Sequence, residues 1–214
     1  MTAAQKRQAW RTLHDRLYGL YGECSCPLRH ETPFQLLAAV MLSAQCRDER
    51  VNQVTEILFS EAPGPREMAA IPVERIAEII RPCGLFRAKS ENLHACAETL
   101  LSRFRGEVPR TMEELTTLPG IGRKSANVLL GNAFGEPGFP VDTHVRRLLN
   151  RIGLVSSQSP EAIEAAANAN LPPALWCNFS HLLIQHGRRV CHAGRPECGS
   201  CAVAPLCRRR GVKK

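Results

Sequence analysis

The chain has 214 residues, 44% of them hydrophobic, so it can bury one large core or two smaller ones. It has no apolar run near the roughly 18 residues that a membrane span needs, and its charged, amphipathic start lacks the apolar centre of a signal peptide. These features exclude a membrane-spanning or secreted protein and predict a cytoplasmic one. The net charge is +8, and residues 186–214 carry eight Arg or Lys against one acid, which favours a polyanionic partner such as nucleic acid.

Helical periodicity runs through nearly the whole sequence, and the alternating pattern of strands is absent from it. Thr32–Pro33 and Ser159–Pro160 are pairs that typically start helices. Thr111 opens a T-x-x-E capping box. The expected helical segments are residues 32–45, 72–84, 89–104, 111–115, 159–170 and 174–187. The sequence therefore predicts an all-α fold.

The stretch LPGIGRKSANVLL combines a glycine-rich turn with the start of an apolar helix. Gly120 and Gly122 allow a positive φ and bring the backbone close to another surface. The helix begins near Arg123, and its free N–H groups and positive dipole end form a phosphate site. We therefore expect a helix-hairpin-helix that binds the DNA backbone through Leu118, Gly120, Gly122 and Arg123. The alternative is a plain turn between two helices.

Lys124 follows in the first turn of that helix. It is one of only five lysines among the 28 basic residues of the chain. An amine, unlike a guanidinium, can lose its proton and attack carbon. The positive end of the helix dipole and any burial both favour the neutral amine. Lys124 is therefore a candidate nucleophile, with phosphate contact as the alternative role.

The next helix starts in the stretch VDTHVRRLLNRIG. Asp142, one of only three aspartates, is placed as its N-cap, and capping alone would explain the residue. Asp142 nevertheless stands at a helix start, as Lys124 does. If the two helix starts converge, an amine and a carboxylate face one pocket, as nucleophilic catalysis requires. We also assign His144, in the same stretch, to DNA contact.

Four of the ten cysteines are crowded near the C-terminus. Cys191, Cys198, Cys201 and Cys207 follow the spacing C-x6-C-x2-C-x5-C. Thiolates this dense in an intracellular chain typically bind metal rather than form disulfides. The spacing lacks the two separated knuckles of a zinc ribbon and favours a [4Fe–4S] cube, with zinc as the alternative. We expect the other six cysteines to be free thiols, most of them buried in helices.

Several motifs occur together, namely LLAAVMLSAQCRDERVNQVT, GLFRAKSENL, GEVPRTMEELTTLPGIGRKSANVLL, VDTHVRRLLNRIG, LLIQHGRRVC and the cysteine stretch. In this combination, from about Thr32 to Cys207, the chain closely resembles the endonuclease III family, the bifunctional DNA glycosylases and AP lyases of the helix-hairpin-helix superfamily. The resemblance implies a six-helix barrel with the helix-hairpin-helix over residues 26–136. It also implies a second helical domain, residues 1–25 with 137–214, that carries a [4Fe–4S] cluster. The active site would lie between the two domains.

By motif match, the resemblance makes Lys124 the Schiff-base nucleophile and Asp142 the catalytic carboxylate. Gln45 and Leu85 would be wedge residues that fill the gap left by a flipped nucleotide. The implied partner is double-stranded DNA that contains oxidised pyrimidines or abasic sites, bound by a monomeric, nucleoid-associated enzyme. Lys124 also separates this chain from related adenine glycosylases, which carry a small hydroxyl residue there, and from thymine-mismatch glycosylases, which tend to carry Tyr.

Two other functions remain compatible with parts of the sequence. A non-catalytic DNA-binding module with a structural metal loop would explain the charge, the hairpin and the cysteines, but not Lys124 or Asp142. A monofunctional glycosylase of the same fold would use water as its nucleophile. Borohydride trapping separates these functions, because only a lysine-based lyase becomes joined to abasic DNA.

Overall fold

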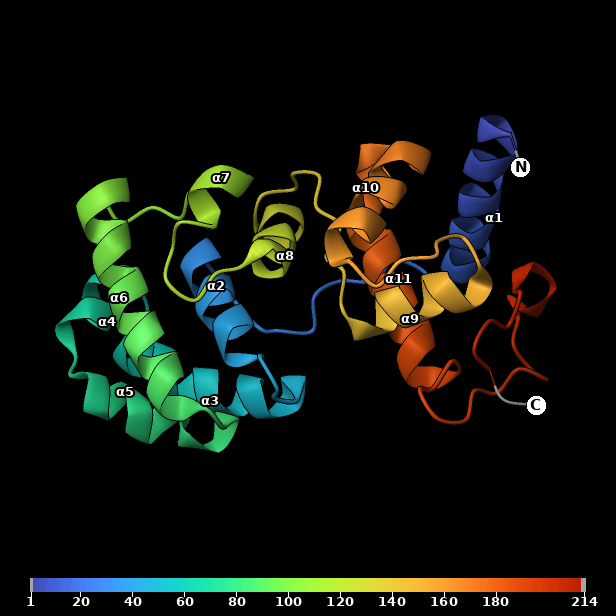
Figure 1. Cartoon of the computed structure of the whole chain (residues 1–214). Helices are drawn as coiled ribbons and strands as arrows, with labels where there is room; N and C mark the ends of the chain where they lie inside the picture. Colours follow the sequence, from blue (N-terminus) through green and yellow to red (C-terminus); the bar gives the residue numbers. More distant parts are fainter. Residues whose placement is uncertain (1, 213–214) are drawn as a thin grey trace. The chain divides into compact units, whose positions relative to one another are not determined.

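The computed structural model describes residues 2–212, and all regular secondary structure in that range is helical. Lys213 and Lys214 of the basic tail lie outside the described residues. The all-α prediction is confirmed. No helix among residues 2–212 is long and apolar enough to cross a membrane. The elements are α1 Ala3–Tyr21, α2 Pro33–Leu42, α3 Asp48–Glu61, α4 Pro65–Ala70, α5 Val73–Ile80, η1 Arg81–Cys83, α6 Phe86–Phe104, α7 Met112–Leu115, α8 Arg123–Ala133, α9 Thr143–Ile152, α10 Pro160–Asn170, η2 Pro173–Leu175, α11 Trp176–Arg189 and η3 Ala204–Leu206 (Figure 1).

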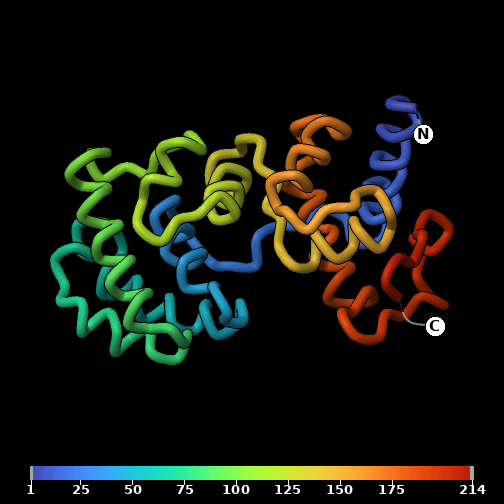
Figure 2. Tube along the Cα trace, viewed as in Figure 1, coloured from blue at the N-terminus to red at the C-terminus, as the bar shows by residue number. Residues whose placement is uncertain are grey.

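The chain divides into two compact units. One unit combines Met1–Ser25 with Pro137–Lys214, and the other is Cys26–Glu136. The chain thus enters the second unit after α1 and returns to the first after α8 (Figure 2). Below, the first is called the cysteine-loop unit and the second the hairpin unit.

Helix α2 is the central element of the hairpin unit. The hydroxyl of Thr32 accepts a hydrogen bond from the Gln35 N–H at 3.2 Å, which caps the helix at the predicted start. Every side chain from Phe34 to Leu42 is buried. Helices α3, α6 and α8 pack against α2, and α6 also packs against α4 and α5. This arrangement places the end of α2, the start of α6 and the hairpin before α8 around one core.

Helix α11 is the central element of the cysteine-loop unit. It packs against α9 and α1, and α1 also packs against α10. The rings of Trp10 and Phe139 each lie with their centroid 6.2 Å from that of Phe179, and all three side chains are fully buried. Aromatic packing therefore joins α1 to segments far along the sequence.

The helix boundaries depart from the prediction at two places that matter for the site. Helix α2 ends at Leu42 rather than at Gln45, because Gln45 has φ = 55°, which an α-helix cannot accommodate. Helix α6 starts at Phe86, three residues earlier than expected. Helices α3 and α4 were not among the expected segments, although acidic first-turn residues Asp48 and Glu49 are a helix-start signal.

Candidate functional site

The hairpin joins α7 to α8 through a turn that is anchored in the core. The Ile121 N–H donates to the Leu118 carbonyl oxygen at 3.1 Å, and both side chains are buried. Gly120 has φ = 76°, and a Cβ there would lie 2.6 Å from Met41 Cε and 3.1 Å from Asn92 Cβ. Gly120 therefore needs both its positive φ and its missing side chain. Because the Leu118 side chain is part of the core, only its backbone is available for a contact with DNA.

Gly122 differs from Gly120. Its backbone is extended, with φ = −98°, and a Cβ would meet no atom within 4 Å. The positive φ that a glycine allows is therefore used at Gly120 but not at Gly122. Gly122 is the N-cap of α8 and has no side chain that could cap the helix. The next two residues, Arg123 and Lys124, are exposed in the first turn. The open space at Gly122 and the uncapped helix start suit the approach of an anion.

These two glycines should respond differently to alanine. Gly120→Ala should lower the free energy of unfolding by about 1–2 kcal/mol, since it forces an L-residue into the left-handed region. Gly122→Ala should keep most of the stability but weaken DNA binding about threefold to tenfold, the scale of one lost hydrogen bond. Thermal unfolding and a DNA titration measure the two effects. Equal DNA affinity for Gly122→Ala and wild type would contradict the assignment of this helix start to phosphate.

Asp142 is the N-cap of α9, as predicted. Its Oδ1 accepts a hydrogen bond from the Val145 backbone N–H at 2.8 Å. The segment before it is held by Ser180 of α11, whose buried hydroxyl donates to the Pro140 carbonyl oxygen at 2.7 Å. Capping uses one lone pair of a carboxylate that has two oxygens. Asp142 can therefore cap the helix and act on a substrate at once.

His144 is oriented by Arg147, one turn further along α9. The guanidinium Nη2 lies 3.0 Å from His144 Nδ1 and also donates to the Gly187 carbonyl oxygen at 3.0 Å. Because a guanidinium can only donate, Nδ1 is the acceptor and the neutral ring carries its proton on Nε2. Burial lowers the pKa of His144, and the Asp142 carboxylate opposes this shift. His144 therefore has an Nε2–H group as its hydrogen-bond donor.

Gln45 and Leu85 share an unusual backbone conformation. Both are in the left-handed region, with φ = 55° and φ = 49°. Neither is glycine, so each conformation costs free energy that the surrounding structure must supply. Both side chains are exposed; Leu85 is 58% exposed, and Ile57 of the same unit is 53% exposed. The structure thus presents both predicted wedge residues to solvent.

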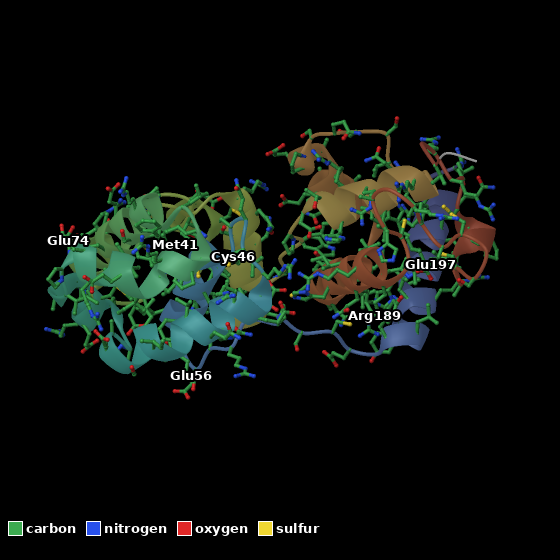
Figure 3. The ribbon with its side chains drawn as sticks, turned by 90° about the horizontal axis from the view of Figure 1, so that it is seen from below. Met41, Cys46, Glu56, Glu74, Arg189 and Glu197 are labelled. Carbon is green, nitrogen blue, oxygen red and sulfur yellow. The ribbon has the colours of Figure 1, made fainter. Side chains whose placement is uncertain are left out.

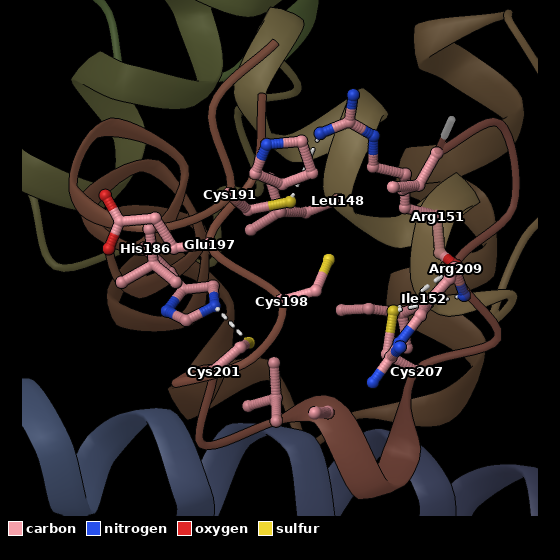
Figure 4. A pocket seen from close by; sticks show the side chains of 15 residues that line it. Leu148, Arg151, Ile152, His186, Cys191, Glu197, Cys198, Cys201, Cys207 and Arg209 are labelled. Carbon is pink, nitrogen blue, oxygen red and sulfur yellow. Dashed lines mark hydrogen bonds between the residues drawn. The ribbon is translucent and has the colours of Figure 1, made fainter. Parts of the chain in front are cut away.

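The four clustered cysteines lie around one pocket in the cysteine-loop unit (Figure 4). Apolar side chains that include Leu148, Ile152 and Val203 also line this pocket. Burial raises the pKa of Cys201 and of Cys207; backbone hydrogen bonds oppose this shift, and the neighbouring thiols add to it. Thiols that resist ionisation by themselves ionise readily when they ligate a cationic metal centre.

Polar groups surround the sulfur atoms. Cys191 Sγ lies 3.4 Å from Arg151 Nη1, and Cys207 Sγ lies 3.3 Å from the Arg209 backbone N–H. Cys201 Sγ lies 3.3 Å from His186 Nε2 (Figure 4). Hydrogen bonds of this kind stabilise and tune thiolate ligands.

Sequence reasoning did not assign the residues that support the cysteine pocket. Arg151 also donates to the His192 and Ala193 carbonyl oxygens, each at 2.6 Å, and so ties the loop to α9. The other ring nitrogen of His186, Nδ1, lies 2.9 Å from the Tyr21 hydroxyl. Nothing in the sequence marks Arg151, in the last turn of α9, or the buried His186 as a residue that contacts the cysteines.

Four thiols suit either a [4Fe–4S] cluster or a single zinc ion. Among the described residues, no three Cys, His, Asp or Glu side chains are arranged to hold one metal ion. A tetrahedral zinc site needs all its ligands about 2.0–2.3 Å from one point. In a [4Fe–4S] cube each thiolate binds a different iron, so the four sulfurs stand further apart. The four cysteines that line one pocket are as many thiolates as a [4Fe–4S] cube requires.

The predicted residues fall into two groups. Lys124, Gln45, Leu85 and the hairpin belong to the hairpin unit, which also contains the labelled Met41 and Cys46 (Figure 3). Asp142, His144 and the four cysteines belong to the cysteine-loop unit. Of the six other cysteines, Cys83 and Cys96 are buried, so the expectation that most of the six are buried is wrong. Cys46 and Cys177 are partly exposed, and so are Cys24 and Cys26 in the stretch ECSC, which already looks exposed in the sequence.

Several known proteins are similar to this chain in sequence and in fold. The HhH-GPD superfamily, described as base excision DNA repair protein, matches residues 38–173. Endonuclease III of Synechocystis sp. is 45% identical over 205 residues, which are 95% of this chain and 94% of that protein. The structure of a non-covalent endonuclease III–DNA complex has a TM-score of 0.91 at 39% identity, covering 98% of this chain and 96% of that one. A trapped covalent endonuclease III–DNA intermediate has a TM-score of 0.90 at 39% identity, covering 98% and 97%.

The all-α fold, the glycine hairpin and these matches define a DNA repair enzyme of the HhH-GPD superfamily. The non-catalytic alternative is thereby set aside. Within that superfamily the chain belongs to the endonuclease III family, and it is a DNA glycosylase and AP lyase of base excision repair.

Proposed function

We propose that this enzyme excises oxidised or ring-fragmented pyrimidines from duplex DNA and then cleaves the strand through a Schiff base on Lys124. The observation that carries this proposal is the exposed amine of Lys124 in the first turn of α8, directly after the uncapped start at Gly122. A helix start that attracts a phosphate brings the adjoining sugar within reach of that amine. The trapped covalent complex of a protein 39% identical to this chain supports the same chemistry.

Binding and base extrusion would rest on the hairpin unit. The backbone at Gly120 and Gly122, with Arg123, would contact phosphates on one side of the lesion. Extruding a nucleotide costs a few kcal/mol of stacking and pairing, and less when the base is already damaged. Gln45 and Leu85 would offset that cost by filling the gap, which is a role that explains an exposed leucine.

The chemistry would begin with the Lys124 amine attacking C1′ of the extruded nucleotide. The bond from C1′ to the base nitrogen breaks, and the base leaves with the bonding electrons and a proton. The ring oxygen O4′ then leaves C1′ and takes the one remaining amine proton, so the sugar ring opens and an imine joins Lys124 to C1′. Removal of a C2′ proton then expels the 3′ phosphate by β-elimination, and hydrolysis of the imine frees Lys124.

Asp142 would act at the first of these steps. Its carboxylate would stabilise the positive charge that develops on the sugar, or accept a proton from the amine. His144, oriented by Arg147, would donate from Nε2 to the DNA backbone. We propose that the enzyme works as a monomer in the cytoplasm, associated with the nucleoid.

We propose that Cys191, Cys198, Cys201 and Cys207 hold a [4Fe–4S] cluster. When bound, the cluster supplies a cross-link that shapes the basic loop against the DNA backbone and takes no part in bond breaking. His186 and Arg151 would direct their N–H groups at Cys201 and Cys191. The donor set and its spread around one pocket support this proposal.

The cluster proposal predicts a visible property. We expect the purified protein to be yellow-brown, with absorbance near ~400 nm from thiolate-bound iron, and to contain iron and acid-labile sulfide. Chelation of the iron should bleach the absorbance. A colourless protein with stoichiometric zinc and no sulfide would contradict the assignment.

Borohydride trapping tests the proposed reaction. Wild-type protein mixed with abasic duplex DNA and borohydride should form a covalent adduct, because borohydride reduces the imine between enzyme and DNA. An enzyme that uses water as its nucleophile forms no imine and therefore no adduct. Duplexes with thymine glycol should give the same adduct after base loss. Excision of the base without any adduct would instead support the monofunctional glycosylase.

A further inference from the structure

Lys89, near the start of α6, is a buried lysine that the proposed reaction does not use. Its side chain belongs to the hairpin unit and is only 6% exposed. The Nζ atom donates to the Leu42 carbonyl oxygen at 2.8 Å and to the Cys83 carbonyl oxygen at 2.9 Å. One amine thus joins two segments that are far apart in sequence.

Each of these carbonyl groups ends a helix. Leu42 is the last residue of α2, and Cys83 is the last residue of η1. Carbonyl groups at helix ends lack intrahelical donors, and a lysine amine is a favourable partner for them. Burial lowers the pKa of Lys89, and the thiols of Cys83 and Cys46 oppose that shift. Burying an amine is costly unless its hydrogen bonds are made, so the two bonds hold Lys89 and both helix ends in place.

The two helix ends lead directly to the proposed wedge residues. Gln45 comes three residues after Leu42, and Leu85 comes two residues after Cys83. Both are exposed and both hold a left-handed backbone conformation. Such strained conformations persist only when the surrounding structure determines them. The hydrogen bonds from Lys89 fix the backbone at Leu42 and Cys83, just before each of these two residues.

We infer that Lys89 is a positioning residue that ties the two wedge segments together, so that Gln45 and Leu85 enter the duplex as one preorganised unit. This inference rests on the proposed function, which assigns the wedge role to those two residues. Lys89 does not touch DNA in this proposal, and it acts only through the two backbone segments.

Lys89→Met keeps an unbranched side chain that is one atom shorter and removes both hydrogen bonds. We expect single-turnover excision from duplex DNA to fall about tenfold or more, because loosened wedge segments no longer offset the cost of extrusion. Fluorescence of 2-aminopurine beside the lesion, which reports unstacking, should fall in parallel. Borohydride trapping on a single-stranded abasic oligonucleotide should stay within about twofold, since no stacked gap has to be filled there. Lys6→Met, at an exposed lysine of α1, is the control and should change none of these three measurements.

A double-mutant cycle separates positioning from a general loss of structure. In a Gln45→Ala/Leu85→Ala background, adding Lys89→Met should lower duplex excision by less than about twofold, because the residues it positions are already gone. Lys89→Arg, which keeps several donors, should recover part of the duplex activity. If Lys89→Met does not fold, Lys89→Arg takes its place in the cycle with the same criterion of non-additivity.

The outcomes distinguish this inference from the proposed function. A wild-type protein that forms no borohydride adduct would overturn the proposed reaction itself. A Gln45→Ala/Leu85→Ala protein with wild-type duplex activity would overturn the wedge assignment, and the role of Lys89 with it. If both of those results are as expected but Lys89→Met lowers duplex and single-strand trapping equally, or adds fully to the wedge variants, only the role of Lys89 is wrong.

Discussion

Lys124→Arg should abolish borohydride trapping and strand cleavage while DNA affinity stays within about tenfold of wild type, or roughly 1.4 kcal/mol. Arginine keeps the positive charge near the start of α8, so phosphate contact survives. A guanidinium does not lose its proton in proteins and cannot form an imine with C1′. Trapping on abasic duplex, a strand-cleavage assay and a binding titration measure the three properties on the same preparation.

The matched control is Lys6→Arg, which makes the same change at an exposed lysine of the cysteine-loop unit. It should trap and cleave as wild type does. If Lys124→Arg still nicks thymine glycol DNA at the wild-type rate, Lys124 is only a phosphate contact. If Lys124→Arg retains base excision but loses cleavage, water can replace the amine in the first step.

Asp142→Asn should lower the rate of base excision by about 10²-fold or more, the usual scale for a positioned acid–base group. The fold should survive, because the amide oxygen of Asn can accept the same hydrogen bond from the Val145 N–H that Oδ1 now accepts. The neutral amide cannot stabilise a positive sugar or accept the amine proton. The single-turnover rate of excision should therefore fall, while the thermal unfolding midpoint should stay the same.

A second capping residue gives the control for this prediction. The Ser159 hydroxyl accepts a hydrogen bond from the Ala162 N–H at 3.2 Å and caps α10 in the same unit. Ser159→Ala should cost about 1 kcal/mol of stability and leave excision unchanged. Should Asp142→Asn excise at the wild-type rate, Asp142 would be a cap and nothing more.

Local patterns in the sequence determined the fold class and most of the proposed site. The cap at Thr32 and the cap at Asp142 each depend on a hydrogen bond to an N–H three residues away, so neighbouring letters are enough to predict them. The spacing of the four cysteines and the position of the lysine after the LPGIG turn are equally local. These features could be predicted because their chemistry is decided within a few residues.

Only the tertiary structure distinguished Gly120, held against Met41, from Gly122, which has open space in front of it. The exposure of Leu85 and its left-handed conformation likewise come from the way η1 meets α6.

The contacts that support the site join residues far apart in the chain: Lys89 and Leu42 are separated by 47 positions, and Tyr21 and His186 by 165. Side-chain periodicity tells which face of a helix is buried, but not which partner from another helix meets it. That pairing depends on the packing of whole helices, which no local stretch of sequence encodes by itself.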